Sequence, residues 1–313
     1  MNPKVSINLC CYNSKQYLRD TLDSIINQSY KDWELVVIND GSKDTTEAII
    51  YEYINRGYPI IYHYHENKGL SISRNEAIQR SSGKYIAFID HDDIWLPEKL
   101  QKQMEAFEGQ KDIDFIYSNY LKMISYRNNK LIQGFKGKQP QGFVFKKFIY
   151  NYKVSISTVV VTRKALNTLD MLFDKRLKQI EEYDVFMRLL YTHKVAYVDK
   201  ILSIYRIHNK MTTISSPEFG PNEYPYLLEK FRFMDPFFDV RYPDIVEYIN
   251  VKLINYTKAK YLLISGNIRE ARQCIAHYKW YDIKTILLYI ASYFPRSLFV
   301  IFYNKLFLSK GRI

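Results

Sequence analysis

The sequence predicts an α/β fold, with a Rossmann-like, mainly parallel sheet flanked by helices, followed by an all-helical region. Apolar, β-prone runs alternate with amphipathic helical patterns over the first part of the chain. Each of these runs ends in polar or acidic residues, and helical periodicity dominates beyond Ser216. We therefore expect a catalytic domain over residues 1–212 and a helical region over residues 213–313.

Four strand-and-helix units open the first domain. Each predicted strand precedes a helical pattern, as where Leu18, Leu22 and Ile25 share one helix face. The predicted strands are Val5–Cys11, Trp33–Asn39, Ile60–Tyr64 and Gly83–Ile89. Helices that connect parallel strands bring the polar strand ends to one edge of the sheet, where ligands bind in open α/β folds.

Later apolar runs extend the sheet, and a polar stretch interrupts them. Residues 125–142 are rich in Asn, Lys, Gln and Gly, which predicts a mobile connection near the cleft. Short helical patterns cover Arg163–Leu166 and Glu181–Leu190. The further predicted strands are Asp114–Tyr120, Ser155–Val161, Val195–Val198 and Ile201–Arg206.

Composition narrows the class of protein. The chain has 313 residues, of which 47% are apolar, and a net charge of +12, which favours an anionic partner such as a phosphate-bearing substrate or an acidic membrane surface. No zinc-finger spacing or helix-turn-helix pattern occurs, so we expect no nucleic-acid partner. The cysteines Cys10, Cys11 and Cys274 imply no disulfide framework, and residues 1–12 lack the pattern of a secretory signal. We expect a cytoplasmic protein.

Three carboxylates follow the fourth predicted strand, in Asp90-His91-Asp92-Asp93. Acids this close repel one another, and a divalent metal ion is the simplest compensation. The alternative is a helix N-cap, with Asp92 or Asp93 capping a helix that begins near Pro97. The residues alone leave both interpretations open.

Other polar residues should gather around the same cleft. Asp40 could accept hydrogen bonds from a ribose or a base edge, or could simply form a turn with Gly41 and Ser42. A Gly-x-Gly-x-x-Gly string is absent, so a nicotinamide dinucleotide site is not supported. The strand ends expected at the cleft carry Tyr12, Asn13, Asp40, Lys68, Arg74, Asp90 and Asp92.

These strings resemble a known family. Tyr12-Asn13, Asn39-Asp40-Gly41-Ser42, an Asn67–Asn75 string and an Asp90–Leu100 string occur in the order and spacing typical of inverting family-2 glycosyltransferases of GT-A fold. The resemblance covers residues 4 to about 212. Cys10-Cys11 stands where the family usually has Pro-Thr or a similar pair, and small residues should preserve the backbone contacts there.

The resemblance implies a role for each cleft residue. Asp40 would contact uracil or ribose, and Asp90 and Asp92 would hold Mg²⁺ or Mn²⁺ against the donor diphosphate. Tyr205-Arg206-Ile207-His208 resembles a family string whose histidine sits at the metal or diphosphate, and imidazole suits both. The implied donor-binding residues are Tyr12, Asn13, Asp40, Lys68, Arg74, Asp90 and Asp93, and the implied metal ligands are Asp90, Asp92 and His208.

A second acidic string, Glu181-Glu182-Tyr183-Asp184, opens a predicted helix. Taken alone, acids at this position stabilise the positive end of the helix dipole. The resemblance implies that Glu182 is the general base for the acceptor hydroxyl. The family usually has Asp there, and Glu moves the carboxylate by one methylene, so Glu181 and Asp184 remain competitors.

The last apolar segment, over residues 285–302, is divided by Pro295-Arg296, which disfavours a simple membrane crossing. We expect two aromatic-rich helices that lie on an anionic membrane surface. The alternative is a helical pair packed on its own domain. The flanking cations are Lys279, Lys284, Lys305, Lys310 and Arg312.

The expected function is transfer of a hexose from a UDP-sugar to a hydroxyl of a glycan acceptor, with inversion of configuration. The narrower resemblance, to bacterial enzymes of glycan assembly, implies an acceptor linked to polyprenyl diphosphate at the cytoplasmic face of the inner membrane. Two other classes of protein share part of this pattern. A nucleotidyltransferase would normally show a Gly-rich basic loop near its start, and a non-catalytic sugar- or lipid-binding module would tolerate loss of the acids.

Overall fold

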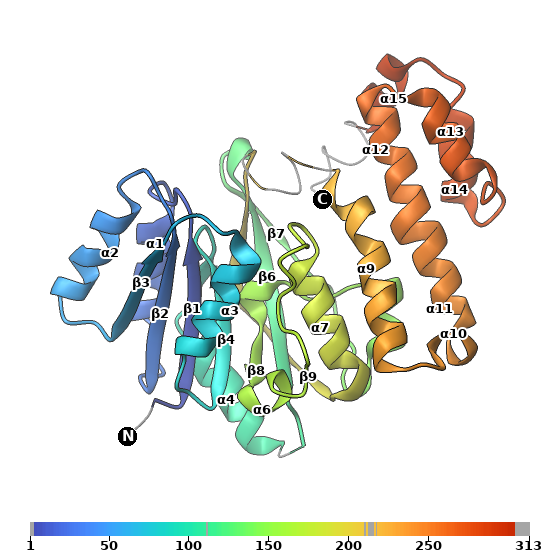
Figure 1. Cartoon of the computed structure of the whole chain (residues 1–313). Helices are drawn as coiled ribbons and strands as arrows, with labels where there is room; N and C mark the ends of the chain where they lie inside the picture. Colours follow the sequence, from blue (N-terminus) through green and yellow to red (C-terminus); the bar gives the residue numbers. More distant parts are fainter. Residues whose placement is uncertain (1–2, 111, 210, 212–215, 217, 304–313) are drawn as a thin grey trace. The chain divides into compact units, whose positions relative to one another are not determined.

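The structure is a computed structural model that describes residues 3–110, 112–209, 211, 216 and 218–303. The chain forms two compact units (Figure 1). The first comprises Met1–Lys175 and Glu181–His208, and the second comprises Arg176–Ile180 and Asn209–Ile313. The predicted boundary between residues 212 and 213 lies outside the described residues and stays a prediction.

A mixed sheet forms the centre of the first unit. Within the described residues it has nine strands in the order β3-β2-β1-β4-β8-β6-β9-β5, with β7 paired to β6. Strands β1 to β4 pair in parallel, β6 and β9 are also parallel, and β8 lies antiparallel between β4 and β6. The bounds are β1 Val5–Cys11, β2 Trp33–Asp40, β3 Ile60–His65, β4 Tyr85–Asp90, β5 Ile94–Trp95, β6 Phe115–Ile124, β7 Lys130–Gln133, β8 Val160–Thr162 and β9 Val195–Ile207.

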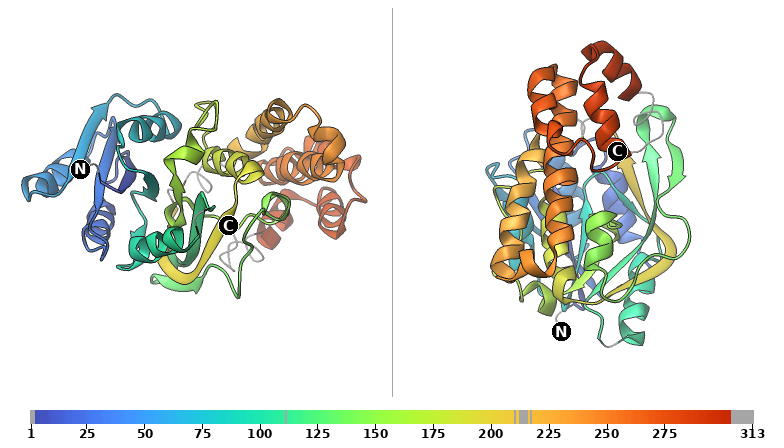
Figure 2. Two further views of the ribbon diagram at one scale, coloured as in Figure 1. Left: turned by 90° about the horizontal axis from the view of Figure 1, so that it is seen from below. Right: turned by 90° about the vertical axis from the view of Figure 1, so that its right-hand side faces the viewer.

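Helices cover both faces of this sheet (Figures 1 and 2). Their bounds are α1 Leu18–Ile26, α2 Thr46–Asn55, α3 Leu70–Arg80, α4 Lys99–Gly109, α5 Phe145–Tyr150, α6 Arg163–Leu166 and α7 Glu181–Thr192. The predicted α/β class and its strand-and-helix units are confirmed.

Alternation along the strands decides which side chains meet which helices. Leu9 of β1 belongs to the core shared with α1, α2 and α4, whereas the adjacent Cys10 packs with Ala77 of α3. In β4, Phe88 contacts Phe186 of α7, at 6.0 Å between ring centroids. Asp90 follows Phe88 by two residues and therefore lies on the face covered by α3 and α7.

Three predicted segments differ from the structure. Ser155–Val161 is not one strand: Ile156–Thr158 forms a 3-10 helix, η2, and only Val160–Thr162 is extended. Both the backbone and the hydroxyl of Thr158 donate to the Ser155 carbonyl, a local bond that competes with the sheet.

The two strands predicted over residues 195–206 are one, β9, whose register against β6 shifts between Ser118 and Tyr120. Residues 125–142 include a 3-10 turn, η1 Ser125–Arg127, and β7, which forms a hairpin with β6. The mobility predicted for this stretch stays a prediction.

Helices make up the described part of the second unit. One core cluster joins Leu262 of α12, Ile275 of α13 and Leu288 of α14. The segment Arg176–Ile180 belongs to this unit because the Glu223 carboxylate accepts hydrogen bonds from three of its backbone N–H groups. The bounds are α9 Phe219–Met234, α10 Phe238–Arg241, α11 Pro243–Tyr248, the π-helix η3 Ile249–Tyr256, α12 Thr257–Ser265, α13 Ile268–Ala276, α14 Ile283–Ala291 and α15 Arg296–Tyr303.

Helices α14 and α15 are separated at Pro295, as the sequence predicts. Among the described residues, none of the helices combines the length and the apolar character needed to cross a bilayer. Lys305, Lys310 and Arg312 lie outside the described residues.

Candidate active site

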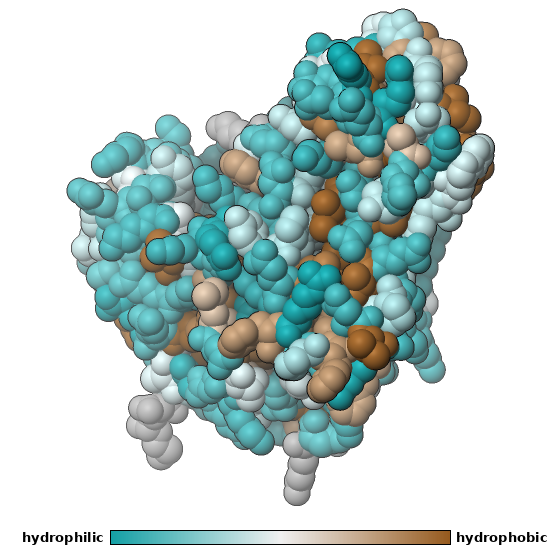
Figure 3. Space-filling model, turned by 45° about the vertical axis from the view of Figure 1, so that its right-hand side comes forward, coloured by the Kyte–Doolittle hydropathy of each residue, from teal (hydrophilic) through white to brown (hydrophobic). Residues whose placement is uncertain are grey.

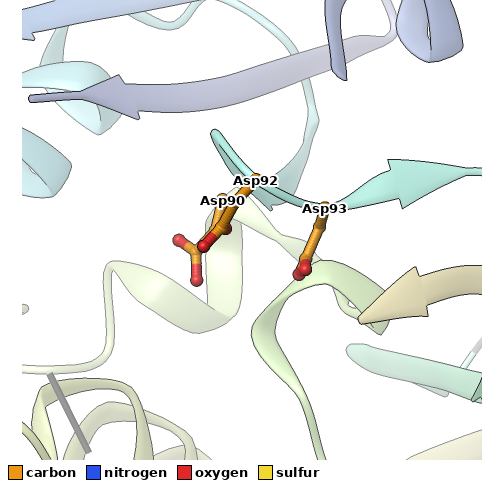
Figure 4. A group of neighbouring side chains, drawn as sticks. All are labelled: Asp90, Asp92 and Asp93. Atoms are coloured by element: carbon orange, nitrogen blue, oxygen red, sulfur yellow. The ribbon is translucent and has the colours of Figure 1, made fainter. Parts of the chain in front are cut away.

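The acidic turn lies at the carboxyl end of β4. One carboxylate oxygen from each of Asp90, Asp92 and Asp93 can be chosen so that all three lie within 4.8 Å of one another. Figure 4 shows the three side chains pointing to the same side of the turn. The sequence prediction that these acids come together is therefore confirmed in geometry.

Two neighbouring elements fix the backbone of this turn. The Thr21 hydroxyl of α1 lies 2.9 Å from the His91 carbonyl oxygen and 2.8 Å from that of Asp93. Arg206 of β9 donates through Nε to the Asp92 carbonyl oxygen at 2.8 Å. Backbone held from both sides presents the carboxylates in a defined arrangement before any ligand binds.

Asp93 has the most enclosed carboxylate of the three. It is fully buried and accepts hydrogen bonds from the Ser157 hydroxyl and, at 2.9 Å, from the Arg206 backbone N–H. Burial, followed by the charges of Asp92 and Asp90, raises its pKa. The capping alternative is wrong for both Asp92 and Asp93, because α4 follows Glu98 and has no side-chain cap. The donor contact predicted for Asp93 stays a prediction.

Asp92 is paired with a histidine. His208 Nε2 lies 2.7 Å from Asp92 Oδ2, and the His208 ring packs against Tyr17 at 5.1 Å between centroids. Burial by itself would raise the pKa of Asp92, but His91 and the His208 contact outweigh it, and the pKa is lowered. Asp92 is therefore held ionised, as a cation ligand must be.

This donor set fits a divalent cation. Carboxylate oxygens are the ligands that Mg²⁺ prefers, and the adjacent imidazole is compatible with Mn²⁺. Asp90 and Asp92 would be the ligands, with His208 beside them, and these assignments stay predictions.

Arg74 of α3 connects the acidic turn to the helix that carries the second acidic string. Its Nη2 lies 2.8 Å from Asp90 Oδ1, and its Nη1 lies 2.7 Å from Glu181 Oε1. The guanidinium is buried, which favours the neutral form, but the charges of Asp90 and Glu181 more than compensate and raise the pKa of Arg74. Both terminal nitrogens of Arg74 therefore bind acids of the protein itself. The donor contact predicted for Arg74 stays a prediction.

The three acids at the start of α7 have different surroundings. Glu181 binds Arg74, and buried Asp184 lies 2.8 Å from Arg188, which also donates to the carbonyl oxygen of Leu172. Glu182 is only half-buried and forms no ion pair within the part of the chain that the structure describes. Its pKa is raised to about 8 by burial and then by Asp90 and Glu181, with Arg74 opposing. Of the three, Glu182 is the acid most suited to accept a proton.

Asp40, at the end of β2, binds its own loop. Its carboxylate accepts hydrogen bonds from the backbone N–H of Lys68 at 2.7 Å and of Gly69 at 3.0 Å. This carboxylate therefore fixes the start of α3, and it is almost fully buried. The predicted contact with uracil or ribose remains untested.

The loop after β1 is tied to the loop after β2. Asn13 has a φ of 50°, a left-handed conformation that Asn tolerates, and its N–H donates to the Ser42 hydroxyl at 2.9 Å. Its side-chain oxygen accepts from the Lys43 N–H at 2.8 Å. Tyr12 and Lys68 are both exposed, so their side chains remain free to contact a ligand.

Three residues that hold the turn were not identified from the sequence. Tyr17 lies beneath both His208 and the Arg206 guanidinium, Asp20 forms an ion pair with Arg206 at 2.9 Å, and Ser157 bonds Asp93. Tyr17 and Asp20 belong to an ordinary amphipathic pattern, and Ser157 lies in a predicted strand. The sequence contained no local signal for them.

The mixed sheet, the acidic turn that ends β4 and the carboxylates that open α7 together define a glycosyltransferase of GT-A fold. Residues 6–168 match the model of the family described as Glycosyl transferase family 2, which is more than half of the chain. The chain belongs to this family, and the resemblance stated from its motifs is confirmed.

One relative and two solved structures are similar to this chain. The chain is 31% identical over 217 residues to the UDP-Glc:alpha-D-GlcNAc-diphosphoundecaprenol beta-1,3-glucosyltransferase WfgD of Escherichia coli, covering 69% of this chain and 81% of WfgD. S. aureus TarS 1-349 in complex with UDP-GlcNAc aligns with a TM-score of 0.62 at 19% identity, covering 92% of this chain and 90% of TarS.

The mannosyltransferase PcManGT from Pyrobaculum calidifontis, in complex with GDP-Man and Mn²⁺, aligns with a TM-score of 0.58 at 13% identity, covering 98% and 88% of the two chains. At these identities the two structural alignments show the shared fold.

Proposed function

We propose that this glycosyltransferase moves a hexose from a UDP-sugar to a hydroxyl of a glycan acceptor, with inversion of configuration at the transferred carbon. One arrangement carries the proposal. Glu182 stands half-exposed at the start of α7, and its neighbour Glu181 is linked through Arg74 to Asp90 of the acidic turn. A proton acceptor and a cation-binding turn are thus held together by one buried guanidinium.

The loops of this chain and two related proteins support a UDP-sugar as the donor. TarS was solved with UDP-GlcNAc, and the name of WfgD specifies UDP-Glc. In this chain, Tyr12, Asn13 and Asp40 follow β1 and β2 at the carboxyl edge of the parallel strands, where nucleotides bind in such sheets. We therefore assign the uridine to these loops and the diphosphate to the region of Asp90 and Asp92.

A divalent cation is part of the proposal. Asp90 and Asp92 would hold Mg²⁺ or Mn²⁺, and PcManGT, which shares the fold, was solved with Mn²⁺. When bound, such a cation neutralises negative charge on the leaving diphosphate. His208 orients Asp92 through its 2.7 Å contact and is the third candidate ligand.

Glu182 acts on the acceptor. Its carboxylate accepts the hydroxyl proton as the acceptor oxygen attacks the anomeric carbon from the side opposite the diphosphate, which inverts the configuration. The raised pKa of about 8 makes this carboxylate a stronger base than an ordinary glutamate. Asp184 is less suited because its carboxylate is fully buried and already paired with Arg188.

We also propose that the acceptor is lipid-linked and that the helical unit contacts an anionic membrane surface. The name of WfgD specifies a diphosphoundecaprenol acceptor. On α14 and its flanks, apolar side chains at helical spacing are exposed at the surface, namely Trp280, Ile283, Leu287, Ile290 and Phe294. Figure 3 shows hydrophobic residues, in brown, at the surface of the helical unit. We call these five residues the α14 apolar face.

Basic residues flank this face. Lys279 precedes α14, exposed Lys284 lies in its first turn, and exposed Arg296 begins α15. Asp282, the acid in this stretch, forms an ion pair with Lys252 at 2.9 Å. An apolar stripe bordered by cations is the pattern that binds the headgroup region of anionic lipids. Such binding would place the protein peripherally on the cytoplasmic face of the inner membrane.

The test of the proposed function is release of UDP from a panel of UDP-hexoses, with and without EDTA, followed by an acceptor screen. We expect one UDP-hexose to give metal-dependent release that increases when a glycan acceptor is added. Failure to release UDP with every donor, acceptor and metal would favour a binding module instead.

A further inference from the structure

Two lysines near the site have no acidic partner among the described residues. Lys122 of β6 and Lys153, in the loop after α5, are both half-buried, and neither forms an ion pair with any carboxylate that the structure describes. Burial, and then the charge of Lys153, lowers the pKa of Lys122. Half-buried like charges repel one another, and an anion bound between them would remove the cost.

Strand register places Lys122 beside the candidate active site. It stands opposite Tyr205 of β9 and lies on the same side of β6 as Tyr120, two residues earlier. The rings of Tyr120 and Tyr205 pack against each other with centroids 6.2 Å apart. Arg206, which follows Tyr205, donates its backbone N–H to Asp93 at 2.9 Å, so the two rings adjoin the acidic turn. Two residues of a strand span about 7 Å, so Lys122 lies about that far from Tyr120 along β6.

Lys153 approaches the same place from another element. Its Nζ lies 5.4 Å from the centroid of the Phe135 ring, and Phe135 packs edge-on against Tyr120 at 5.1 Å. Tyr152, its neighbour in the chain, packs edge-on against Tyr183 with ring centroids 4.6 Å apart, and Tyr183 directly follows Glu182. Aromatic rings therefore connect both lysines to residues that adjoin Glu182 and Asp93.

We propose that Lys122 and Lys153 bind the phosphate groups of a diphosphate-linked acceptor, while Tyr120 and Tyr205 contact its sugar. This inference rests on the proposed function and deepens it. A sugar whose reacting hydroxyl points to Glu182 and whose anomeric phosphate points away would fill the interval between base and lysines. Aromatic rings suit the apolar faces of a sugar, and ammonium groups suit phosphate.

The diphosphate of the donor is the other source of the same chemistry. In the proposed arrangement that group lies at Asp90 and Asp92 instead. The two sources differ in one respect that can be measured, because saturating UDP occupies the donor site and leaves the acceptor site open.

The experiment is a calorimetric titration of the full chain with octyl diphosphate in Mg²⁺, carried out with and without saturating UDP. We expect the wild type to bind the probe and Lys122→Met/Lys153→Met to bind it about tenfold or more weakly, since charge-assisted hydrogen bonds are lost. Lys130→Met, which changes an exposed lysine of β7, should bind like the wild type.

Equal affinity in the wild type and the double variant, or no binding to the wild type, would overturn the inference. Binding that saturating UDP abolishes would assign the lysines to the donor and overturn it too. The titration requires no turnover, so a failure of the proposed transferase activity is read separately, from UDP release. The UDP affinity of the double variant should equal that of the wild type.

Discussion

Arg74 and Asp90 form a short ion pair, with 2.8 Å between Nη2 and Oδ1, on the sheet face covered by α3 and α7. The second terminal nitrogen of Arg74 binds Glu181, so this guanidinium neutralises two acids from two different elements. Asp90 is expected to bind a cation. The Arg74 side chain therefore holds this expected cation ligand next to α7, the helix that carries Glu182.

Arg74→Met should destabilise the fold strongly. It leaves the Asp90 and Glu181 carboxylates without their cation in a largely buried site, a loss of about 3–5 kcal/mol in the free energy of unfolding. Urea unfolding measures this. Arg80→Met on the same helix removes an exposed pair with Glu76 and should change that free energy by less than about 1 kcal/mol. If the two variants were equally stable, the ion pairs of Arg74 with Asp90 and Glu181 would not contribute to the stability of the fold.

Glu182→Gln should lower the rate of transfer by about 10²–10⁴-fold while leaving UDP affinity unchanged, because the amide cannot accept the acceptor proton. Asp184→Asn should act mainly on stability, since Asp184 pairs with buried Arg188. Single-turnover rates, UDP titration and thermal unfolding of the two variants separate these effects. Normal turnover by Glu182→Gln together with a large loss in Asp184→Asn would move the base to Asp184.

The raised pKa of Glu182 predicts the pH dependence of activity. Below about pH 8 the carboxyl group is increasingly protonated and cannot accept a proton, so kcat/KM for the acceptor should rise with pH and level off above that value. A bound cation near Asp90 would shift this limb to lower pH. If activity instead rose with pH around 4.5, the ordinary pKa of a glutamate, then either the pKa of Glu182 is not raised or Glu182 is not the base.

The same shift predicts a pH dependence of stability. Between pH 4.5 and about 8 the folded state binds the Glu182 proton more tightly than the unfolded state, so its contribution to stability falls as the pH rises. Glu182→Gln removes this term. Relative to the wild type, the variant should therefore be more stable at pH 9 than at pH 4.5, and a difference that does not vary with pH would contradict the shift.

Membrane contact can be tested on the α14 apolar face. Ile283→Glu/Leu287→Glu should reduce binding to vesicles that contain phosphatidylglycerol, because the double change places charge where apolar side chains would enter the headgroup region. Co-sedimentation measures the bound fraction. Val240→Glu alters an even more exposed apolar residue, in α10, and should have little effect. Equal binding by all three proteins would exclude this face as the contact.

Local patterns in the sequence were sufficient to predict the parallel strands and the acids at their ends. Strands such as β1 and β4 are short apolar runs that end in polar residues, and the acidic turn and the start of α7 are contiguous strings. The role of Arg74 was not predictable in this way. Its partners Asp90 and Glu181 lie 16 and 107 residues away in the sequence, so only the folded chain brings them together.

The surroundings of single acids also required the structure. Asp92 and Asp93 are adjacent in the sequence, yet one contacts His208 and the other is enclosed by Ser157 and the backbone of Arg206. The turn between β4 and β5 and the 3-10 helix that contains Ser157 decide this difference. The sequence pattern of Ser155–Val161 predicts a strand and gives no indication of the 3-10 helix at Ile156–Thr158.

The most direct test of the account is metal-dependent release of UDP by the wild type and by Asp92→Asn. With the preferred UDP-hexose and acceptor, we predict that Mg²⁺ or Mn²⁺ supports turnover, that EDTA abolishes it and that added metal restores it. Asp92→Asn should stay folded and lose at least about 10²-fold in rate, since one ligand carboxylate is gone. Full turnover in EDTA, or by Asp92→Asn, would contradict the assignment of the acidic turn as the cation site of this enzyme.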